Sequence, residues 1–187
     1  MTQNPDRKFY LREFKAISHA ISTYEDLNLL INHIAEGTTR TFDAKGCCIM
    51  LYDDRENQLF TVSSYGVSEK YTDKGPLWVD NNDCAFVQGE PVYIADTQND
   101  PRIQYPAAAK EEGIVSILSI PISYRGTAVG TIRIYHGEAK HFNEEDIESL
   151  KILAEHLGLV IEINGLKNFL DKVKMAMDSL PMRMLKE

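Results

Sequence analysis

A row of polar side chains in an apolar stretch is the part of this sequence best suited to chemistry. Residues 113–137 hold the two longest apolar, β-branched runs, which predict a β-hairpin. The row consists of Ser119, Thr131, Arg133 and Tyr135. A sheet face that serves only for packing avoids such residues, because a buried polar group without a hydrogen-bond partner costs free energy. We therefore predict that the row binds a polar ligand, and that Arg133 under a cover needs an anion or an internal acid such as Asp83.

The three cysteines could supply a nucleophilic thiol or metal ligands. Cys47 and Cys48 are adjacent in a predicted strand, where a buried free cysteine behaves as a small apolar residue. Cys84 lies in a loop-rich region and could sense oxidation. Thiol turnover needs a second, resolving thiol, and residues 103–107 offer none. The three cysteines make neither a disulfide framework nor a zinc set, so they predict a reduced compartment.

Other catalytic chemistry has no support in the local sequence. The five histidines lie on different predicted elements without a metal-binding spacing, at His19, His33, His136, His141 and His156. Asp96, Asp100 and Arg102 could bind a ligand, but loop carboxylates that cap short helices and an arginine that fixes a loop by an ion pair explain them better. We predict no metal site, no catalytic residue and no enzymatic activity.

The register of the hairpin decides which side chains share a face with the polar row. Tyr124, Arg125 and Gly126 can form a three-residue loop with Gly126 in the left-handed conformation. In that register one face carries Leu118, Ile120, Ile122, Ala128, Gly130, Ile132 and Ile134, and the other carries Ile117, Ser119, Val129, Thr131, Arg133 and Tyr135. We expect helices on the first face and a ligand on the second. A two-residue turn would exchange the strand partners and mix the two sets.

Two helices are predicted before the first strand. Apolar positions that follow one another by four, three and four residues predict a helix over 7–22. The second helix begins after Ser22 and Thr23, whose hydroxyls can cap it, and ends near Phe42 and Asp43. Its apolar side carries Leu27, Leu30, Ile31, Ile34 and Thr38.

A second hairpin and a loop-rich region complete the predicted sheet face. Strands over 46–52 and 58–65 are joined by a polar turn. Proline and glycine break residues 66–113 into short pieces, with one brief strand at 92–95. Loop-rich inserts of this length are often lids or binding walls. Aromatic residues that flank it can form the floor or the lining of a pocket: Tyr65, Trp78 and Phe86.

A long helix is predicted from Asn143, which can cap it, to just before Pro181. Its first part places Ile147, Leu150, Leu153, Leu157 and Ile161 on a face that suits a sheet. Its later apolar residues alternate by four and three, the spacing of a coiled-coil seam: Leu159, Ile163, Leu166, Leu170, Val173, Met177 and Leu180. Past about residue 162 this seam needs a partner. We expect the same helix of a second copy, and a first helix that folds back is the alternative.

The order of these elements, together with local motifs between about residues 20 and 164, resembles the GAF domain family. The motifs are residues 88–96, 100–102 and 116–122, Gly126, residues 129–131, and Phe142 with Asp146 and Leu150. The resemblance implies an α+β fold with an antiparallel sheet of five or six strands. It places the terminal helices on one face and a ligand pocket under the loop region on the other. It also implies sensory or regulatory work, usually as a dimer.

Three specialised branches of that family resemble the chain less closely. Cyclic-nucleotide-binding members carry an Asn-Lys pair where Tyr135 and His136 stand here, and a Glu in place of Ile147. Bilin-binding members attach their chromophore through a Cys on the helix that corresponds to residues 106–112, which contain none. The branch that reduces free methionine sulfoxide uses catalytic and resolving cysteines, and only Cys84 has a counterpart there by its loop context.

Composition restricts the partners. The chain of 187 residues has a net charge of −8, which repels a phosphate backbone and argues against nucleic acid. Its 43% hydrophobic and 26% charged residues are typical of one globular domain, and no apolar run is long enough for a membrane span. The first residues lack an apolar signal core, so we expect a cytoplasmic protein.

Together these features predict a non-catalytic sensory protein for signal transduction, a regulator of bacterial type. Residues 1–22 would form an N-terminal helix of a dimer bundle, 23–164 the sensory domain, and 165–187 a seam-forming extension. The cofactor is unknown and the small-molecule ligand unidentified; the residues predicted to bind the ligand are Tyr65, Trp78, Asp83, Cys84, Phe86, Ser119, Thr131, Arg133 and Tyr135. We expect a homodimer that signals to a separate kinase or regulator. The alternatives are a ligand-free interaction scaffold and a redox sensor or methionine sulfoxide reductase-like enzyme based on Cys84.

Overall fold

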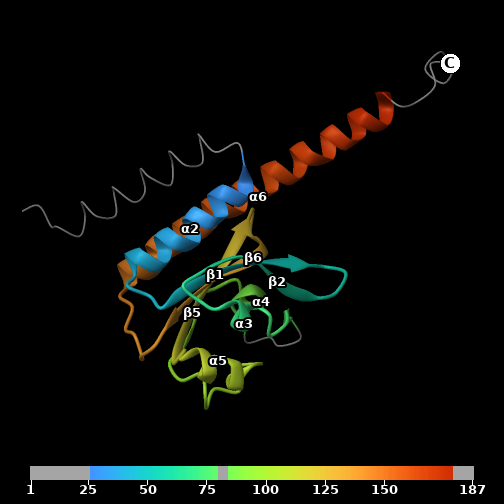
Figure 1. Cartoon of the computed structure of the whole chain (residues 1–187). Coiled ribbons are helices and arrows are strands. Elements are labelled where there is room, and N and C mark those ends of the chain that lie inside the picture. The colour runs from blue at the N-terminus through green and yellow to red at the C-terminus, as the bar shows by residue number, and fades with distance from the viewer. Residues whose placement is uncertain (1–25, 80–83, 179–187) are drawn as a thin grey trace, which may run out of the picture.

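One antiparallel sheet organises the part of the chain that the computed structural model describes, residues 26–79 and 84–178 (Figure 1). Its six strands are β1 (Gly46–Asp53), β2 (Gln58–Tyr65), β3 (Leu77–Trp78), β4 (Val92–Ile94), β5 (Ser116–Tyr124) and β6 (Thr127–His136). They lie in the order β3-β2-β1-β6-β5-β4, and every neighbouring pair is antiparallel. The predicted α+β fold with a five- to six-stranded sheet is confirmed. The predicted helix over 7–22 lies outside the described residues.

The central hairpin differs from its predicted loop but keeps its predicted faces. Tyr124 pairs with Thr127, so the loop has two residues, and both Arg125 and Gly126 have positive φ, 50° and 80°. Primed two-residue turns require such angles and match the twist of the strands. The expected three-residue loop is therefore wrong.

A bulge next to this turn restores the register. Ser123 pairs with Ala128 but Ile122 pairs with Gly130, so Val129 is an extra residue on β6. Beyond it Leu118 and Ile134 lie opposite each other, as expected for the helix-covered face. Val129 itself packs on that helix-covered side, which corrects its predicted place beside the polar row.

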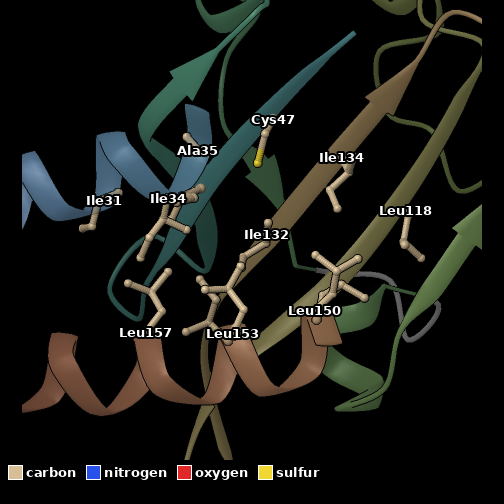
Figure 2. Packing of buried hydrophobic residues seen from close by; sticks show 14 of the residues in the cluster. Ile31, Ile34, Ala35, Cys47, Leu118, Ile132, Ile134, Leu150, Leu153 and Leu157 are labelled. Carbon is tan, nitrogen blue, oxygen red and sulfur yellow. The ribbon is translucent and has the colours of Figure 1, made fainter. Parts of the chain in front are cut away.

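Helices α2 (Leu27–Thr41) and α6 (Glu144–Asp178) lie next to each other on one face of the sheet (Figure 1). Figure 2 shows how side chains of both helices meet those of the strands in one apolar core. The buried members of this core are Leu30, Ile31, Ile34, Ala35, Cys47, Ile49, Leu118, Ile120, Ile122, Ile132, Ile134, Leu150, Leu153, Ala154 and Leu157. Most of these residues belong to the predicted apolar stripes of the two helices or to the predicted helix-facing side of the central hairpin. Cys47 and Ile49 of β1, with Ala35 and Ala154 of the helices, were not in those predicted sets.

The caps of the two helices were predicted with unequal success. The expected cap of α2 at Ser22 and Thr23 is wrong, because α2 starts at Leu27 and the carboxylate of Asp26 accepts a hydrogen bond from the backbone N–H of Asn28 at 2.8 Å. A cap must directly precede the first helical residue, and Asp26 holds that place. For α6 the prediction is confirmed, since the side chain of Asn143 accepts a hydrogen bond from the backbone N–H of Asp146 at 2.8 Å.

The opposite face of the sheet is covered by the loop-rich residues 66–79 and 84–112. They contain three short helices, α3 (Glu69–Thr72), α4 (Ala85–Gln88) and α5 (Pro106–Glu112). We call these residues the cover. A second apolar core lies beneath it, with Cys48, Met50, Leu59, Tyr71, Leu77, Ala85, Val92, Ile94, Ala109, Ile114, Ile117 and Tyr135 buried. The sheet thus separates a helix-covered face from a loop-covered face, as expected.

The second half of α6 extends past the sheet (Figure 1). Its first half buries Leu150, Leu153 and Leu157. The seam side chains that the structure describes beyond them are between 37% and 63% exposed: Leu159, Ile163, Leu166, Leu170 and Val173. Within one chain this apolar stripe has no cover among the described residues.

Candidate functional site

The polar row lies on the loop-covered face, as its alternation predicts. Ser119 of β5 lies directly opposite Arg133 of β6, and Thr131 and Tyr135 are two residues to either side of Arg133 on the same strand. Ile117 and Tyr135 belong to the core beneath the cover, which fixes the direction of their face. The structure therefore brings these four predicted site residues together, away from α2 and α6.

Three polar atoms of this row are buried without a hydrogen-bond partner among the described residues. They are Oγ of Ser119, Oγ1 of Thr131 and Nε of Arg133. Ser119 is 3% exposed and Thr131 2%. Most buried polar groups in folded proteins have partners, so a group of neighbouring exceptions needs an explanation, for which a bound molecule is a recognised one.

Two tyrosines pack against each other where the polar row ends on β6. The rings of Tyr135 and Tyr71 of α3 meet edge to face, with centroids 5.4 Å apart. Burial raises the pKa of Tyr71 to about 12 and that of Tyr135 well above its ordinary value. Both hydroxyls therefore stay protonated at neutral pH. They can donate hydrogen bonds but cannot neutralise a cation.

A lysine of the cover is held close to the row. Nζ of Lys74 donates a hydrogen bond to the backbone oxygen of Tyr71 at 3.0 Å and lies 4.0 Å from the centre of the Tyr71 ring. Burial lowers the pKa of Lys74, and the neighbouring charge of Arg133 lowers it further. The negative charge of Glu112 of α5 raises the pKa of Lys74. The Glu112 carboxylate already accepts hydrogen bonds from the backbone N–H and the hydroxyl of Ser68. Among the described residues, Lys74 and Arg133 thus place two positive charges here against the one negative charge of Glu112.

Cys48 is buried next to this group of residues. Burial raises its pKa, and a hydrogen bond with Tyr135 and the charges of Lys74 and Arg133 offset part of that rise. Cys47 points to the helix-covered core, and burial raises its pKa further. Both thiols are therefore protonated and poorly nucleophilic at neutral pH.

The remaining predicted site residues lie around the cover. Cys84 holds the N-cap position of α4 as a half-buried free thiol, and the ring of Phe86 stacks on Tyr52 with centroids 4.5 Å apart. Helix α4 packs on β5 and β6, so both residues lie near the strands of the polar row. Trp78 is on β3, separated from β6 by β2 and β1, which places it roughly 14 Å from that strand. Asp83 lies outside the described residues.

Tyr65 is on the wrong side of the sheet for a ligand beneath the cover. It pairs with Cys47, and its hydroxyl accepts a hydrogen bond from Arg40 of α2 at 3.4 Å. A bulge in β2 causes this, because Thr61 pairs with Met50 but Ser63 pairs with Ile49. The extra residue reverses the alternation along the strand, and the sequence carries no clear signal of such an irregularity.

The expected structural role of Asp96, Asp100 and Arg102 is confirmed. Asp96 accepts hydrogen bonds from the backbone of Gln98 and the side chain of Asn99. Arg102 forms an ion pair with Asp100 at 2.5 Å and donates a hydrogen bond to the backbone oxygen of Tyr93. The ion-paired guanidinium lowers the pKa of the Asp100 carboxyl. These residues hold a loop of the cover against β4.

An open groove of ≈ 640 Å³ lies elsewhere, along β2. It is lined by residues of α2, β2 and the segment after α3, among them Asn32, Phe60, Ser63 and Asp73. None of the predicted site residues that the structure describes lines it. Among the described residues no three His, Cys, Asp or Glu side chains are placed to hold a metal ion, and no helix is long and apolar enough to cross a membrane.

Comparison with known proteins gives one family and a consistent fold. The model of the GAF domain family matches residues 25–162. The GAF domain of a phosphoenolpyruvate-protein phosphotransferase from Coxiella burnetii superposes with a TM-score of 0.74 at 22% identity, over 85% of this chain and 96% of that one. The corresponding domain from Acinetobacter gives 0.71 at 17% identity, over 89% and 99%. No curated protein matches the sequence.

One structural relative is an enzyme. The free methionine-R-sulfoxide reductase of Neisseria meningitidis, solved in complex with its substrate, gives a TM-score of 0.69 at 17% identity. The match covers 87% of this chain and 93% of that one. At such identities the similarity shows the fold alone.

Proposed function

The chain belongs to the GAF domain family, whose members are mostly sensory or regulatory, and from this premise we propose that it is a non-catalytic sensor of a small molecule. The ligand binds between the cover and the polar row. One observation carries this proposal, namely the three neighbouring polar atoms of Ser119, Thr131 and Arg133 that are buried without partners among the described residues. A ligand that supplies those partners would favour the closed cover.

The cover is held by polar contacts at its surface, and these can open to admit a ligand. Ser68 of the segment before α3 binds Glu112 of α5, and Lys70 forms an ion pair with Glu111 at 2.7 Å in which both side chains are exposed. Such exposed pairs contribute little free energy. These polar contacts therefore add little to the cost of parting α3 from α5, which is set mainly by the burial of Tyr71 and Ala109.

Strand β6 connects the site to the long helix. It carries Thr131 and Arg133, ends at His136, and leads through residues 137–143 into α6. The hydroxyl of Ser116 donates a hydrogen bond to the backbone oxygen of Glu138 at 2.6 Å, and the rings of His136 and Phe142 lie 5.5 Å apart. A shift of β6 on ligand binding would move the start of α6 through these contacts.

A homodimer through α6 would cover the exposed seam. If Leu159 takes position d of a heptad, Glu162 falls at g and Lys167 at e, five residues later. In a parallel, in-register pair these positions of opposite chains face each other, so Glu162 of one copy meets Lys167 of the other. We propose this arrangement for the dimer, with a separate kinase or regulator as the receiver of the signal.

Thermal unfolding in the presence of a small-molecule panel tests the proposed function. Wild type should show at least one compound that raises Tm, and the same compound should have a smaller effect on Arg133→Ala, because that variant removes a group of the proposed site. If no compound changes Tm and no small molecule is retained on purification, the proposal of a sensor is overturned in favour of an interaction scaffold.

A redox role for Cys84 is the second candidate, favoured by its half-buried free thiol and by the fold shared with the Neisseria reductase. Cys47 and Cys48 stay protonated, so they make poor resolving partners. We therefore expect no turnover of free methionine-R-sulfoxide with dithiothreitol as reductant. Turnover that is lost in Cys84→Ser would establish this second candidate instead.

A further inference from the structure

Arg133 lies on the loop-covered face of β6, directly opposite Ser119 of β5. Its Nε is buried and has no acceptor among the described residues. Nε and the adjacent terminal nitrogen form the edge of a guanidinium that binds a carboxylate through two parallel hydrogen bonds. A carboxylate can accept hydrogen bonds from both donors of this edge, whereas a single carbonyl group fits the pair less well.

The hydroxyls of Ser119 and Thr131 lie close enough to Arg133 to donate hydrogen bonds to the same ligand. Ser119 is the direct cross-strand neighbour of Arg133, so their Cβ atoms are roughly 5 Å apart. Thr131 precedes Arg133 by two residues on the same face, roughly 7 Å along the strand. Each hydroxyl can donate one hydrogen bond, and neither has a partner among the described residues.

The charged side chains near Arg133 indicate the net charge of the ligand. Arg133 and Lys74 contribute two positive charges, and Glu112, the one described acid whose charge acts on Lys74, contributes one negative charge. Among the charges of the described residues, one positive charge therefore remains to be balanced. A monoanion balances it, whereas a dianion would leave a negative charge beneath the cover.

We propose that the ligand is a small organic monocarboxylate whose carboxylate binds Arg133, Ser119 and Thr131. This inference rests on the proposed function and names the ligand class of that site. The other buried residues of this face are largely apolar, including Met50 and Ile117, so the rest of the ligand is uncharged and packs against them. Binding brings acceptors to three donors that have none among the described residues.

Matched pairs of compounds test the charge requirement. Butyrate, benzoate and phenylacetate are each compared with the primary amide of the same acid, which has nearly the same shape and no charge, and with inorganic phosphate. Tm is measured by scanning fluorimetry, and Kd by calorimetry where Tm rises. We expect a carboxylate to raise Tm while its amide does not, and Arg133→Gln to weaken its binding by roughly 10- to 150-fold. Arg125→Gln is the control, because it removes the same charge from the exposed β5–β6 turn.

The hydroxyls give a second test in which folding and binding change in opposite directions. Thr131→Val removes an unpartnered buried hydroxyl at nearly constant volume, so the ligand-free protein should keep or gain stability. The same change should weaken carboxylate binding roughly fivefold or more. A purely structural role for Thr131 would not produce that combination.

The outcomes separate this inference from the proposed function. If amides or other neutral compounds bind as well as carboxylates, or if binding ignores Arg133, a sensor remains but the carboxylate assignment is overturned. Stabilisation by phosphate equal to that by carboxylates also overturns it. If mass spectrometry finds no retained small molecule from a cell extract and no compound raises Tm, both proposals fail. If Asp83→Asn lowers Tm as much as Arg133→Gln and no carboxylate binds, an internal ion pair replaces the ligand.

Discussion

At the scale of single residues, the loop-covered face contains buried polar atoms that lower the stability of the ligand-free protein. A buried polar atom without a partner costs about 1–3 kcal/mol. Ser119, Thr131 and Arg133 concentrate three such atoms on two neighbouring strands. The sequence predicted their common face, because alternation along a strand is local information. It did not predict that Lys74 of the cover would lie close enough to Arg133 and Glu112 for both charges to act on it, because the folding of the irregular cover depends on contacts distant in sequence.

His136 makes stability depend on pH. Its side chain is 3% exposed with Nε2 unpartnered among the described residues, and burial, with the charge of Lys140, lowers its pKa below 6.5. The unfolded chain therefore binds more protons than the folded one between that lowered value and 6.5. We expect the contribution of His136 to the free energy of unfolding to be constant above about pH 7.5 and to fall as pH drops through about 6.5. Denaturant titrations at several pH values measure this.

Two variants identify the titrating group. In His136→Gln the fall in stability between about pH 7.5 and 5.5 should be smaller than in wild type, because the glutamine does not titrate. His141→Gln changes an exposed histidine five residues away and should keep the wild-type slope. Equal slopes in wild type and His136→Gln would contradict this assignment.

At the scale of elements, two bulges decide which side chains reach which face. In β6 the extra Val129 compensates for the two-residue turn, so the predicted faces survive although the predicted loop does not. In β2 the bulge is not compensated, and Tyr65 turns toward α2. Strand positions and burial patterns were therefore predictable from periodicity. A single inserted residue that changes the alternation was not, because it leaves no composition signal.

The fit of α6 on the sheet depends on a glycine. A Cβ at Gly158 would lie 2.3 Å from the backbone oxygen of Ser123 in β5. We expect Gly158→Ala to lower the free energy of unfolding by about 1–3 kcal/mol, because backbone on both sides must shift. Gly165→Ala on the same helix is the matched control, since a Cβ there meets nothing within 4 Å. It should raise stability by up to about 1 kcal/mol through helix propensity. Equal effects of the two changes in urea titrations would contradict the close approach.

At the scale of the whole molecule, α6 has two successive roles. Its first half completes the core that Figure 2 shows. Its second half carries an apolar seam away from the sheet (Figure 1). The change of spacing from a sheet-covering face to a heptad seam was visible in the sequence, and the exposure of Ile163, Leu166 and Leu170 agrees with it. The expected contribution of residues 1–22 to a bundle and of Leu180 to the seam lies outside the described residues.

Self-association tests the proposed use of this seam. Leu166→Asp places a carboxylate at a d position and should weaken dimerisation by roughly 100-fold or more, because the charge would be buried between helices. Asn168→Asp adds the same charge on the far side of the helix and should leave the dimer intact. Sedimentation velocity over a range of concentrations measures both. A monomeric wild type, or equal weakening by both variants, would exclude the seam as the interface.

The continuity of α6 also makes it a lever. The close approach at Gly158 provides a fulcrum against β5, and about 20 residues, or roughly 30 Å of helix, lie between that point and Asp178. A tilt of about 5° at the fulcrum would displace the far tip by roughly 2.6 Å. A displacement of about 1.8 Å at the start of α6, roughly 21 Å before the fulcrum, would produce this tilt and would arrive magnified at the far end of the helix.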